Sequence, residues 1–178
     1  MAKKSNRFSI SPLALFFVKV GVIYAAWNLI YDYFILPHGG LDTFFSWTGV
    51  KLGRMGLSLL GWDALSHERI LWVFGSQGVE IQNGCNGITL FGLYAGFIIA
   101  YPGRMDERMI FLASGILLLF VVNVIRIMVF ALSVYYIPQH WETFHSYAST
   151  IFFYPVVLSL WYLWTTRSSK AGTISFNA

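Results

Sequence analysis

The chain has 178 residues, of which 57% are hydrophobic and 11% are charged, and its formal net charge is +4. A soluble globular domain has about 25% charged residues, so this composition excludes a soluble protein and indicates an integral membrane protein. The basic residues lie at the ends of apolar segments and not in a stripe interleaved with aromatic side chains, which excludes a nucleic-acid partner.

Four apolar segments approach or exceed the length that crosses a membrane. A hydrocarbon core of about 30 Å needs roughly 20 residues of helix. The segments are 13–36, 86–101, 110–136 and 147–164. We therefore predict an all-α integral membrane helical bundle of about four transmembrane helices, which form a single membrane-embedded domain over residues 1–178.

Lysine and arginine predict the orientation of this bundle. With four spans, three basic groups fall on one side, which the positive-inside rule assigns to the cytoplasm. Their members are Lys3, Lys4, Arg7, Arg104, Arg108, Arg167 and Lys170. We expect a multi-pass protein of the inner membrane with both termini in the cytoplasm. Segment 37–84 and the loop 137–146 then face the extracytoplasmic side, and residues 167–178 form a disordered cytoplasmic tail.

The outer segment 37–84 contains two patterns of its own. Residues 43–60 are amphipathic, which fits either a fifth, interfacial helix on the outer leaflet or a short tilted extra span. Residues 69–82 alternate around Gly75-Ser76-Gln77-Gly78, which predicts a small extracytoplasmic β-hairpin. This hairpin leads to the start of the second predicted span.

The second predicted span carries a stripe of small residues. Gly92 and Gly96 are separated by three residues, so they lie on one face of a helix. Small residues at this spacing let two membrane helices approach closely. We expect the stripe to bring the second span near the third.

Cys85, the only cysteine, lies in a polar stretch at the start of the second span. A single cysteine excludes an internal disulfide and a four-ligand zinc site, and no His-Glu-x-x-His pattern is present, so we predict neither a metal nor a cofactor. Thiolates are favoured at helix N-termini and beside cations, which suits a nucleophile. Gly87 helps to leave the thiol open, and Asn83 or Asn86 is expected to cap the helix, with Asn86 also able to donate to an oxyanion.

Arg126 lies inside the third predicted span. An arginine in the middle of a membrane helix costs about 2.5–3.5 kcal/mol on insertion scales and is functional by default. It follows residue 110 by about 24 Å of helix, which places it in the outer half of the bilayer near the depth of Cys85. Asn123 lies one turn earlier on the same face and is expected to orient the guanidinium. The alternative is a structural ion pair, but the second, third and fourth spans contain no Asp or Glu.

His145 lies in the loop before the fourth predicted span, on the same outer side. A lone histidine in a loop is usually solvated, and His140 competes with it. Its position at the mouth of a helix favours His145. Together, a thiolate nucleophile, an imidazole that moves protons and a guanidinium that stabilises negative charge form a set suited to acyl transfer through a thioester.

These residues resemble the exosortase/archaeosortase family, in a short bacterial exosortase-like form. The resemblance lies in Asn83-Gly84-Cys85-Asn86-Gly87, in Asn123-Val124-Ile125-Arg126 and in His145, and it covers roughly Val79 to Trp164. The chain departs from many relatives in having Asn86 after the cysteine, where they have Ser or Ala. It also has about four spans where many relatives have about eight.

The resemblance implies a membrane-embedded cysteine transpeptidase or protease, with Cys85 as the nucleophile and Arg126 and His145 as its partners. Its substrates would be exported proteins with a C-terminal sorting signal, made of a short motif, a transmembrane helix and a basic tail. The implied partners are this sorting helix, membrane lipids and an acceptor glycan or lipid, with water as the other acceptor.

Two other kinds of function remain as alternatives. A non-catalytic membrane subunit or scaffold of envelope polysaccharide or protein export would use Arg126 to bind lipid headgroups or a polyanion, and Cys85 would be incidental. A transporter or channel subunit is disfavoured because polar residues would then be expected through the full depth of the bilayer. Here the polar residues collect at one end of the predicted spans.

Overall fold

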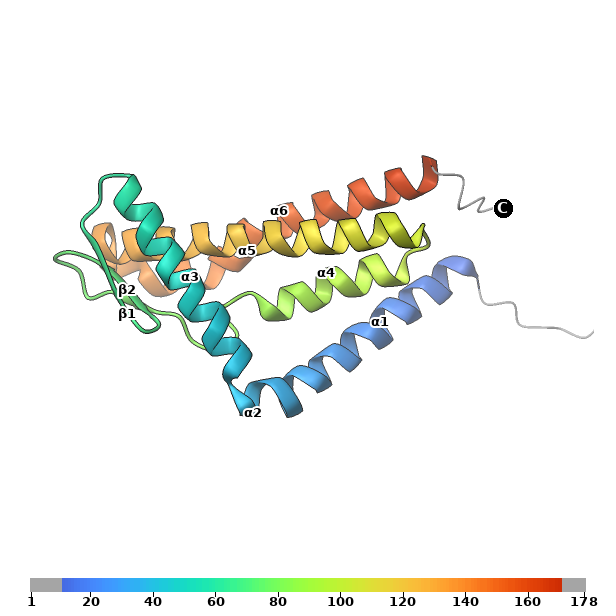
Figure 1. The fold of residues 1–178 in the computed structure, drawn as a ribbon, viewed down its shortest axis with the longest axis horizontal. Helices are drawn as coiled ribbons and strands as arrows, with labels where there is room; N and C mark the ends of the chain where they lie inside the picture. Colours follow the sequence, from blue (N-terminus) through green and yellow to red (C-terminus); the bar gives the residue numbers. More distant parts are fainter. Residues whose placement is uncertain (1–10, 171–178) are drawn as a thin grey trace, which may run out of the picture.

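The structure is a computed structural model that describes residues 11–170 (Figure 1). In chain order its elements are α1 (Pro12–Ile30), a π-helical turn (Tyr31–Ile35), α2 (Leu36–His38), α3 (Gly40–Leu59), β1 (Ala64–His67), β2 (Ile70–Val73), β3 (Val79–Glu80), α4 (Ile88–Ala100), α5 (Met105–Tyr136), a 3-10 turn (Pro138–His140) and α6 (Trp141–Lys170). The described chain is therefore mostly helical with one small sheet. Lys3, Lys4 and Arg7 lie outside the described residues, as does the predicted tail from residue 171 on.

Within residues 11–170, three helical stretches are long and apolar enough to cross a membrane, namely Leu13–His38, Met105–Tyr136 and Pro138–Ser168. They identify the chain as a multi-pass membrane protein. The predicted second span contains α4, which has only 13 residues and is not among these three stretches, so the predicted count of four spans is not shown. The predicted boundaries of the last span differ most from the structure. Helix α6 begins at Trp141 and continues to Lys170, so part of the predicted loop and the first residues of the predicted tail are helical.

Helix α5 is the centre of the bundle and packs against α3, α4 and α6, while α1 packs against α4. Figure 1 shows α4, α5 and α6 running along the long axis of the molecule, with α1 diverging from α4 towards α2. The start of α1, the α4–α5 connection and the end of α6 lie at one end of the molecule. The sheet and the end of α3 lie at the other.

The glycine stripe of α4 faces α1, so the expectation that it contacts the third span is wrong. A Cβ atom on Gly92 would lie 2.1 Å from Trp27 of α1, and one on Gly96 would lie 3.3 Å from Ile23. The close contact between α4 and α5 uses a glycine on α5 instead. Gly115 lies under Tyr94, because a Cβ there would be 2.1 Å from the tyrosine hydroxyl. The spacing of small residues shows which face of a helix carries them, but not which neighbouring helix packs against that face.

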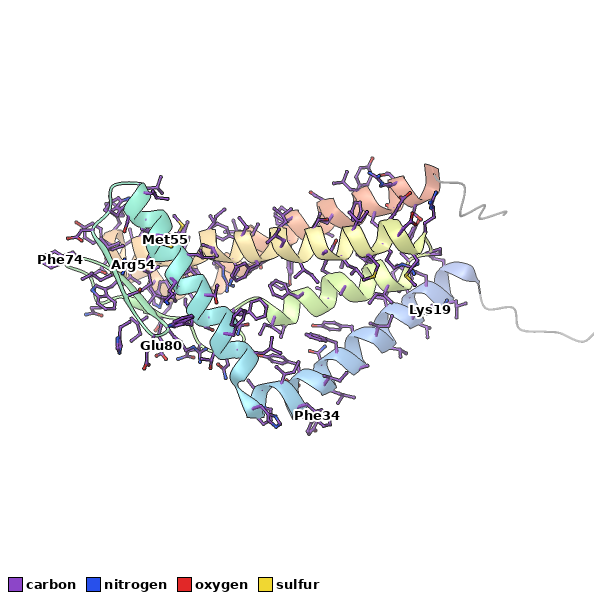
Figure 2. The ribbon with its side chains drawn as sticks, in the orientation of Figure 1. Lys19, Phe34, Arg54, Met55, Phe74 and Glu80 are labelled. Atoms are coloured by element: carbon purple, nitrogen blue, oxygen red, sulfur yellow. The ribbon has the colours of Figure 1, made fainter. Side chains whose placement is uncertain are left out.

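Helix α3 packs on α5 through its small residues. A Cβ on Gly49 would lie 2.9 Å from Ile127 of α5, and one on Gly53 would lie 3.2 Å from Leu71 of β2. The large apolar residues of its sequence pattern are exposed on the other side: Phe44, Trp47, Leu52, Met55 and Leu59. Figure 2 shows the side chains of Arg54 and Met55 on this helix. The amphipathic pattern thus predicted a helix, but its large apolar side chains point outward.

The predicted hairpin at 69–82 is confirmed as β2 and β3. The two strands are antiparallel, with Ile70 opposite Glu80 and Leu71 opposite Val79. The glycines of the turn, Gly75 (φ 88°) and Gly78 (φ 82°), have the positive φ that a tight turn requires. A third strand, β1, pairs with β2 on the other side and was not predicted. Its sequence, Ala-Leu-Ser-His, has no β-branched or aromatic residue that would mark a strand.

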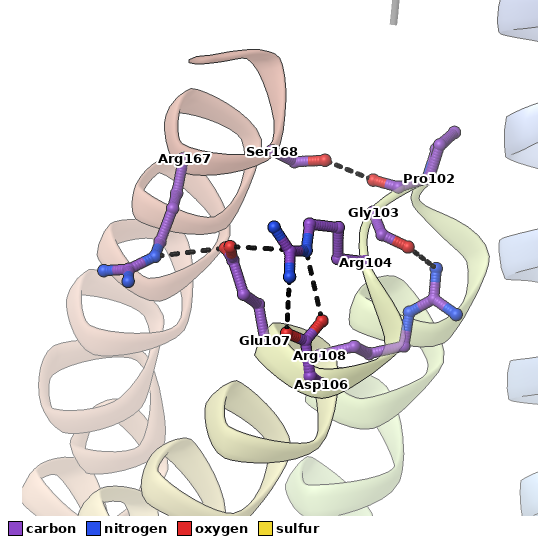
Figure 3. Close-up of polar contacts among 8 residues, drawn as sticks. All are labelled: Pro102, Gly103, Arg104, Asp106, Glu107, Arg108, Arg167 and Ser168. Carbon is purple, nitrogen blue, oxygen red and sulfur yellow. Dashed lines mark hydrogen bonds and ion pairs between the residues drawn. The ribbon is translucent and has the colours of Figure 1, made fainter. Parts of the chain in front are cut away.

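The end of the molecule opposite the sheet is held by polar contacts among the α4–α5 connection, the first turn of α5 and the end of α6 (Figure 3). Glu107 accepts a hydrogen bond from Arg167 (3.2 Å) and forms an ion pair with Arg104 at 3.9 Å. Ser168 donates to the carbonyl oxygen of Pro102 at 2.5 Å, and Arg108 donates to nearby main-chain carbonyls. Exposed ion pairs contribute only about 0–1 kcal/mol each, so this cluster fixes relative position more than stability. Three of the predicted cytoplasmic arginines gather here.

Candidate active site

Cys85 lies in the loop that connects β3 to α4. Its N–H donates to the carbonyl oxygen of Gln82 at 3.1 Å, so the chain turns immediately before the thiol. Gly84 (φ 81°) and Gly87 (φ 87°) flank it in the left-handed region that favours glycine. The residue is half-buried, and its Sγ lies 3.9 Å from Nε2 of His145. Catalytic hydrogen bonds are often this long before substrate binds.

His145 belongs to the second turn of α6 and not to a loop, which corrects the sequence prediction. Its ring packs against two aromatic rings, with centroid distances of 5.3 Å to Trp141 and 5.3 Å to Phe130. Trp141 lies four residues earlier on the same helical face, and Phe130 comes from α5. His140 lies in the preceding 3-10 turn. Helix packing, and not a short loop, therefore holds the His145 imidazole beside the thiol.

Arg126 lies on α5 with 4% of its surface exposed. Its Nη2 donates to the carbonyl oxygen of Cys85 and to Oδ1 of Asn123 (2.9 Å). The guanidinium carbon also lies 5.3 Å from the ring centre of Phe130 and 4.9 Å from that of Phe153, which are cation–π distances. The predicted depth of Arg126 beside Cys85 thus agrees with the structure, and the guanidinium binds the main chain of the cysteine.

A chain of buried hydrogen bonds continues from Arg126 to the N-terminal helices. Asn123 donates from Nδ2 to the carbonyl oxygen of Asn86 at 2.9 Å. Asn86 in turn donates to Oδ1 of Asp42 at 2.6 Å, and the Tyr31 hydroxyl donates to the same oxygen at 2.7 Å. Tyr31 begins the π-helical turn, a geometry often found at functional sites. The π-helical turn, α3 and α5 therefore all fix the loop that carries Cys85.

The two predicted capping asparagines have different environments. Asn86 is fully buried and its Oδ1 accepts from the N–H of Ile88 at 3.2 Å, but the N-cap residue of α4 is Gly87, so neither predicted asparagine is the N-cap. Its amide nitrogen faces Asp42, which directs it away from the predicted role as an oxyanion donor. Asn83 is exposed. Gly87 lies against α5, where an added Cβ would be 3.6 Å from Asn123.

Sequence reasoning missed several residues of this site. Asp42 and Tyr31 complete the buried chain, and Phe130 contacts both Arg126 and His145. Phe130 follows Arg126 by four residues, so helical spacing could have identified it. The sequence marks Asp42 only as a carboxylate in the first turn of an amphipathic helix. Carboxylates are common in first turns because they interact favourably with the helix dipole, so this position alone does not indicate a functional site.

A pocket of about 300 Å³ opens beside the thiol. It is lined by Gly78, Val79, Glu80, Gln82, Cys85, Trp141 and His145. One wall is β3 and the residues that follow it, and the other is the first turns of α6. Among residues 11–170, no group of three or more His, Cys, Asp or Glu side chains is placed to bind a metal ion.

Asp42 provides a test of the buried chain. We expect Asp42→Ala to destabilise the protein by about 2–5 kcal/mol, because the Tyr31 hydroxyl and the Asn86 amide would each lose a buried acceptor. Asp42→Asn keeps an oxygen that can accept from both donors, so its cost should be clearly smaller. Thermal unfolding in detergent measures both variants. Equal stability of Asp42→Ala and the wild type would contradict a structural role for this carboxylate.

Comparison with known families gives one match. The family model described as transmembrane exosortase, Exosortase_EpsH, matches residues 8–163. The match includes every element from α1 to most of α6, together with Cys85, Arg126 and His145. No curated protein and no solved structure matches the chain.

Proposed function

Since this chain belongs to the transmembrane exosortase family, we propose that it is a membrane-embedded cysteine transpeptidase or protease that cleaves the C-terminal sorting signal of exported proteins. The proposal rests on the proximity of the Cys85 and His145 side chains. These residues are 60 positions apart and come from different elements, yet Sγ and Nε2 lie 3.9 Å from each other. A nucleophile and a base within reach of each other are the minimum that covalent acyl transfer requires.

The proposed reaction has two halves. The Cys85 thiolate attacks the scissile carbonyl carbon, and the protonated imidazole of His145 gives its proton to the leaving amine nitrogen as the C–N bond breaks. This leaves a thioester on Sγ. In the second half, neutral His145 takes a proton from the acceptor, whose nucleophilic atom attacks the thioester carbon and releases the thiolate. The acceptor is a glycan, a lipid or water.

Arg126 acts in this scheme through position and charge. Its hydrogen bond to the Cys85 carbonyl fixes the peptide that carries the thiol. Its buried positive charge favours both the thiolate and the negatively charged tetrahedral intermediate, because charges interact more strongly away from water. Asn123 orients the guanidinium, as its Oδ1 accepts from Nη2 at 2.9 Å.

We assign α4 as the second of four membrane spans, although it is short. The end of the molecule where α1 starts and α6 ends also carries Arg104, Arg108 and Arg167, which supports cytoplasmic termini in the inner membrane (Figure 3). Cys85 then faces the extracytoplasmic side with the sheet. The exposed apolar side chains of α3, such as Phe44 and Leu59, favour contact of this helix with the lipids of the outer leaflet.

Replacing His145 tests the proposed proton transfer. We expect His145→Ala to slow processing by about 10²–10⁴-fold, the usual contribution of general acid–base catalysis. The substrate is a secreted reporter whose C-terminus carries a motif, an apolar helix and a basic tail from the same genome, and immunoblotting follows its size. His140→Ala is the matched control, because His140 is an exposed histidine of the preceding turn, and it should process normally. Normal processing by His145→Ala would refute its role.

Thiol reactivity distinguishes the enzyme from a non-catalytic export subunit. Because Cys85 is the only cysteine, labelling with a membrane-impermeant maleimide reports on this residue alone. A nucleophile held near His145 should react rapidly near neutral pH when the reagent is added from outside. Reaction only above about pH 8.5, the ordinary range of a free thiol, would favour the non-catalytic alternative.

A further inference from the structure

Strand β3 leaves one edge of the sheet open beside Cys85. The strand order is β1-β2-β3, so β3 has a neighbour on one side only. On the side of β2, the N–H of Ile81 donates to the Arg69 carbonyl at 2.9 Å, and the C=O of Ile81 accepts from Arg69 Nε at 2.8 Å. Residues of an antiparallel strand alternate between its two edges. The N–H and C=O of Glu80 therefore point away from β2, to the open edge.

This open edge forms a wall of the active-site pocket. The pocket of about 300 Å³ is lined by the consecutive residues Gly78, Val79 and Glu80, then by Gln82, and on its other sides by Cys85, Trp141 and His145. Side chains alternate along the wall, because Val79 and Ile81 are buried whereas Glu80 and Gln82 are exposed. Figure 2 shows Glu80 at the margin of the sheet end of the molecule. A ligand in this pocket meets main-chain groups and the reactive thiol together.

We propose that the substrate binds as a fourth strand along the open edge of β3. On the proposed function, the occupant is the segment of the exported protein that precedes its sorting helix, in extended conformation. This substrate segment runs in the same direction as β3, so the pairing is parallel, and the N–H and C=O of Glu80 would bond main-chain groups of the two substrate residues that flank the one opposite it. The chain then continues past Gln82 to the thiol, where its scissile carbonyl meets Sγ. Recognition through the main chain tolerates many side chains.

The shortness of β3 fits a transient partner. Long open edges promote aggregation, and natural proteins limit them by short strands and charged residues. Strand β3 has two residues, Val79 and Glu80, and the second is an exposed carboxylate. Such an edge is too short to hold a second sheet firmly, but it suffices to align a peptide that is released after cleavage.

Disulfide trapping tests the alignment without catalysis. In a Cys85→Ala background, Glu80→Cys provides one thiol, and the reporter carries one cysteine that is moved in single steps through the segment before its apolar helix. We expect strong crosslinking at one position, weaker crosslinking two residues away and little at the positions between, because side chains alternate on a strand. Gln77→Cys, at an exposed position of the β2–β3 turn, is the control and should crosslink poorly. Crosslinking that does not alternate along the reporter segment, or that is equally strong with Gln77→Cys, would overturn the proposal.

Removing the main-chain donor gives an independent result. Glu80→Pro deletes the outward N–H but spares the bonds to β2, and proline is tolerated on edge strands. We expect Glu80→Pro to process the reporter at least about fivefold more slowly than Glu80→Ala, which keeps the N–H. The loss should come from a raised KM. Maleimide labelling of Cys85 should be the same in both variants. Equal processing by both, with a wild type that processes the reporter, would refute strand addition and leave the proposed thioester chemistry intact.

Discussion

Replacing Cys85 with alanine or serine should abolish processing of the sorting signal, with a loss of at least about 10³-fold. Alanine removes the nucleophile, and a serine hydroxyl is not ionised in this environment, so neither variant forms a thioester. The loop should keep its shape, because the contacts that hold it use the Cys85 carbonyl and N–H and not the sulfur. The measurement is the ratio of processed to unprocessed reporter in membranes.

The acyl-enzyme gives this prediction a direct chemical readout. Wild-type protein incubated with the reporter should form a covalent adduct that hydroxylamine releases, as expected for a thioester. Neither variant should form it. The Cys85→Ala chain contains no thiol, so any remaining maleimide signal in that sample measures contamination. Full processing by purified Cys85→Ala would show that the reaction does not pass through this residue.

Arg126→Ala should also reduce processing strongly, by about 10²–10³-fold, as for the loss of other charge-stabilising donors in active sites. The variant removes the donor to the Cys85 carbonyl and to Oδ1 of Asn123, which is buried. Failure of membrane insertion cannot explain such a loss, because removing an arginine from a span lowers the insertion cost by about 2.5–3.5 kcal/mol.

Arg126→Lys separates charge from geometry. Lysine keeps the positive charge, but its compact ammonium cannot reproduce the planar guanidinium that donates to two oxygens and lies near the rings of Phe130 and Phe153. We expect activity between that of the wild type and that of Arg126→Ala. The matched control is Arg54→Ala, an exposed arginine on α3, which should process the reporter normally (Figure 2). Wild-type activity in Arg126→Ala would refute the assignment.

The sequence predicted the parts of this molecule that depend on local patterns. Hydropathy located the long helices, alternation located the β2–β3 hairpin, and helix rise placed Arg126 at the depth of Cys85. Each of these rests on a periodicity that a single segment carries in its own residues. The predicted orientation placed His145 and Cys85 on the same side of the membrane, but only the structure shows that Sγ and Nε2 lie 3.9 Å apart.

The parts that could not be predicted depend on which segments meet. Nothing in Gly92 or Gly96 shows that α1 covers them, and nothing in Asp42 shows that Asn86 and Tyr31 bond to it. The start of α6 was misplaced because its first turns contain polar residues that are rare in lipid, although Trp141 and His145 share a helical face. Tertiary packing settles these points, and a single sequence does not record it.

The shortness of α4 has a consequence for the bilayer around it. A helix of 13 residues is about 20 Å long, whereas the hydrocarbon core is about 30 Å thick. Lipid responds to a span that is too short by thinning locally. With α4 as the second span and Cys85 on the extracytoplasmic side, both as proposed, this hydrophobic mismatch draws headgroups and water inward at the thiol. A polar acceptor then reaches the acyl group without leaving the hydrated surface of the membrane.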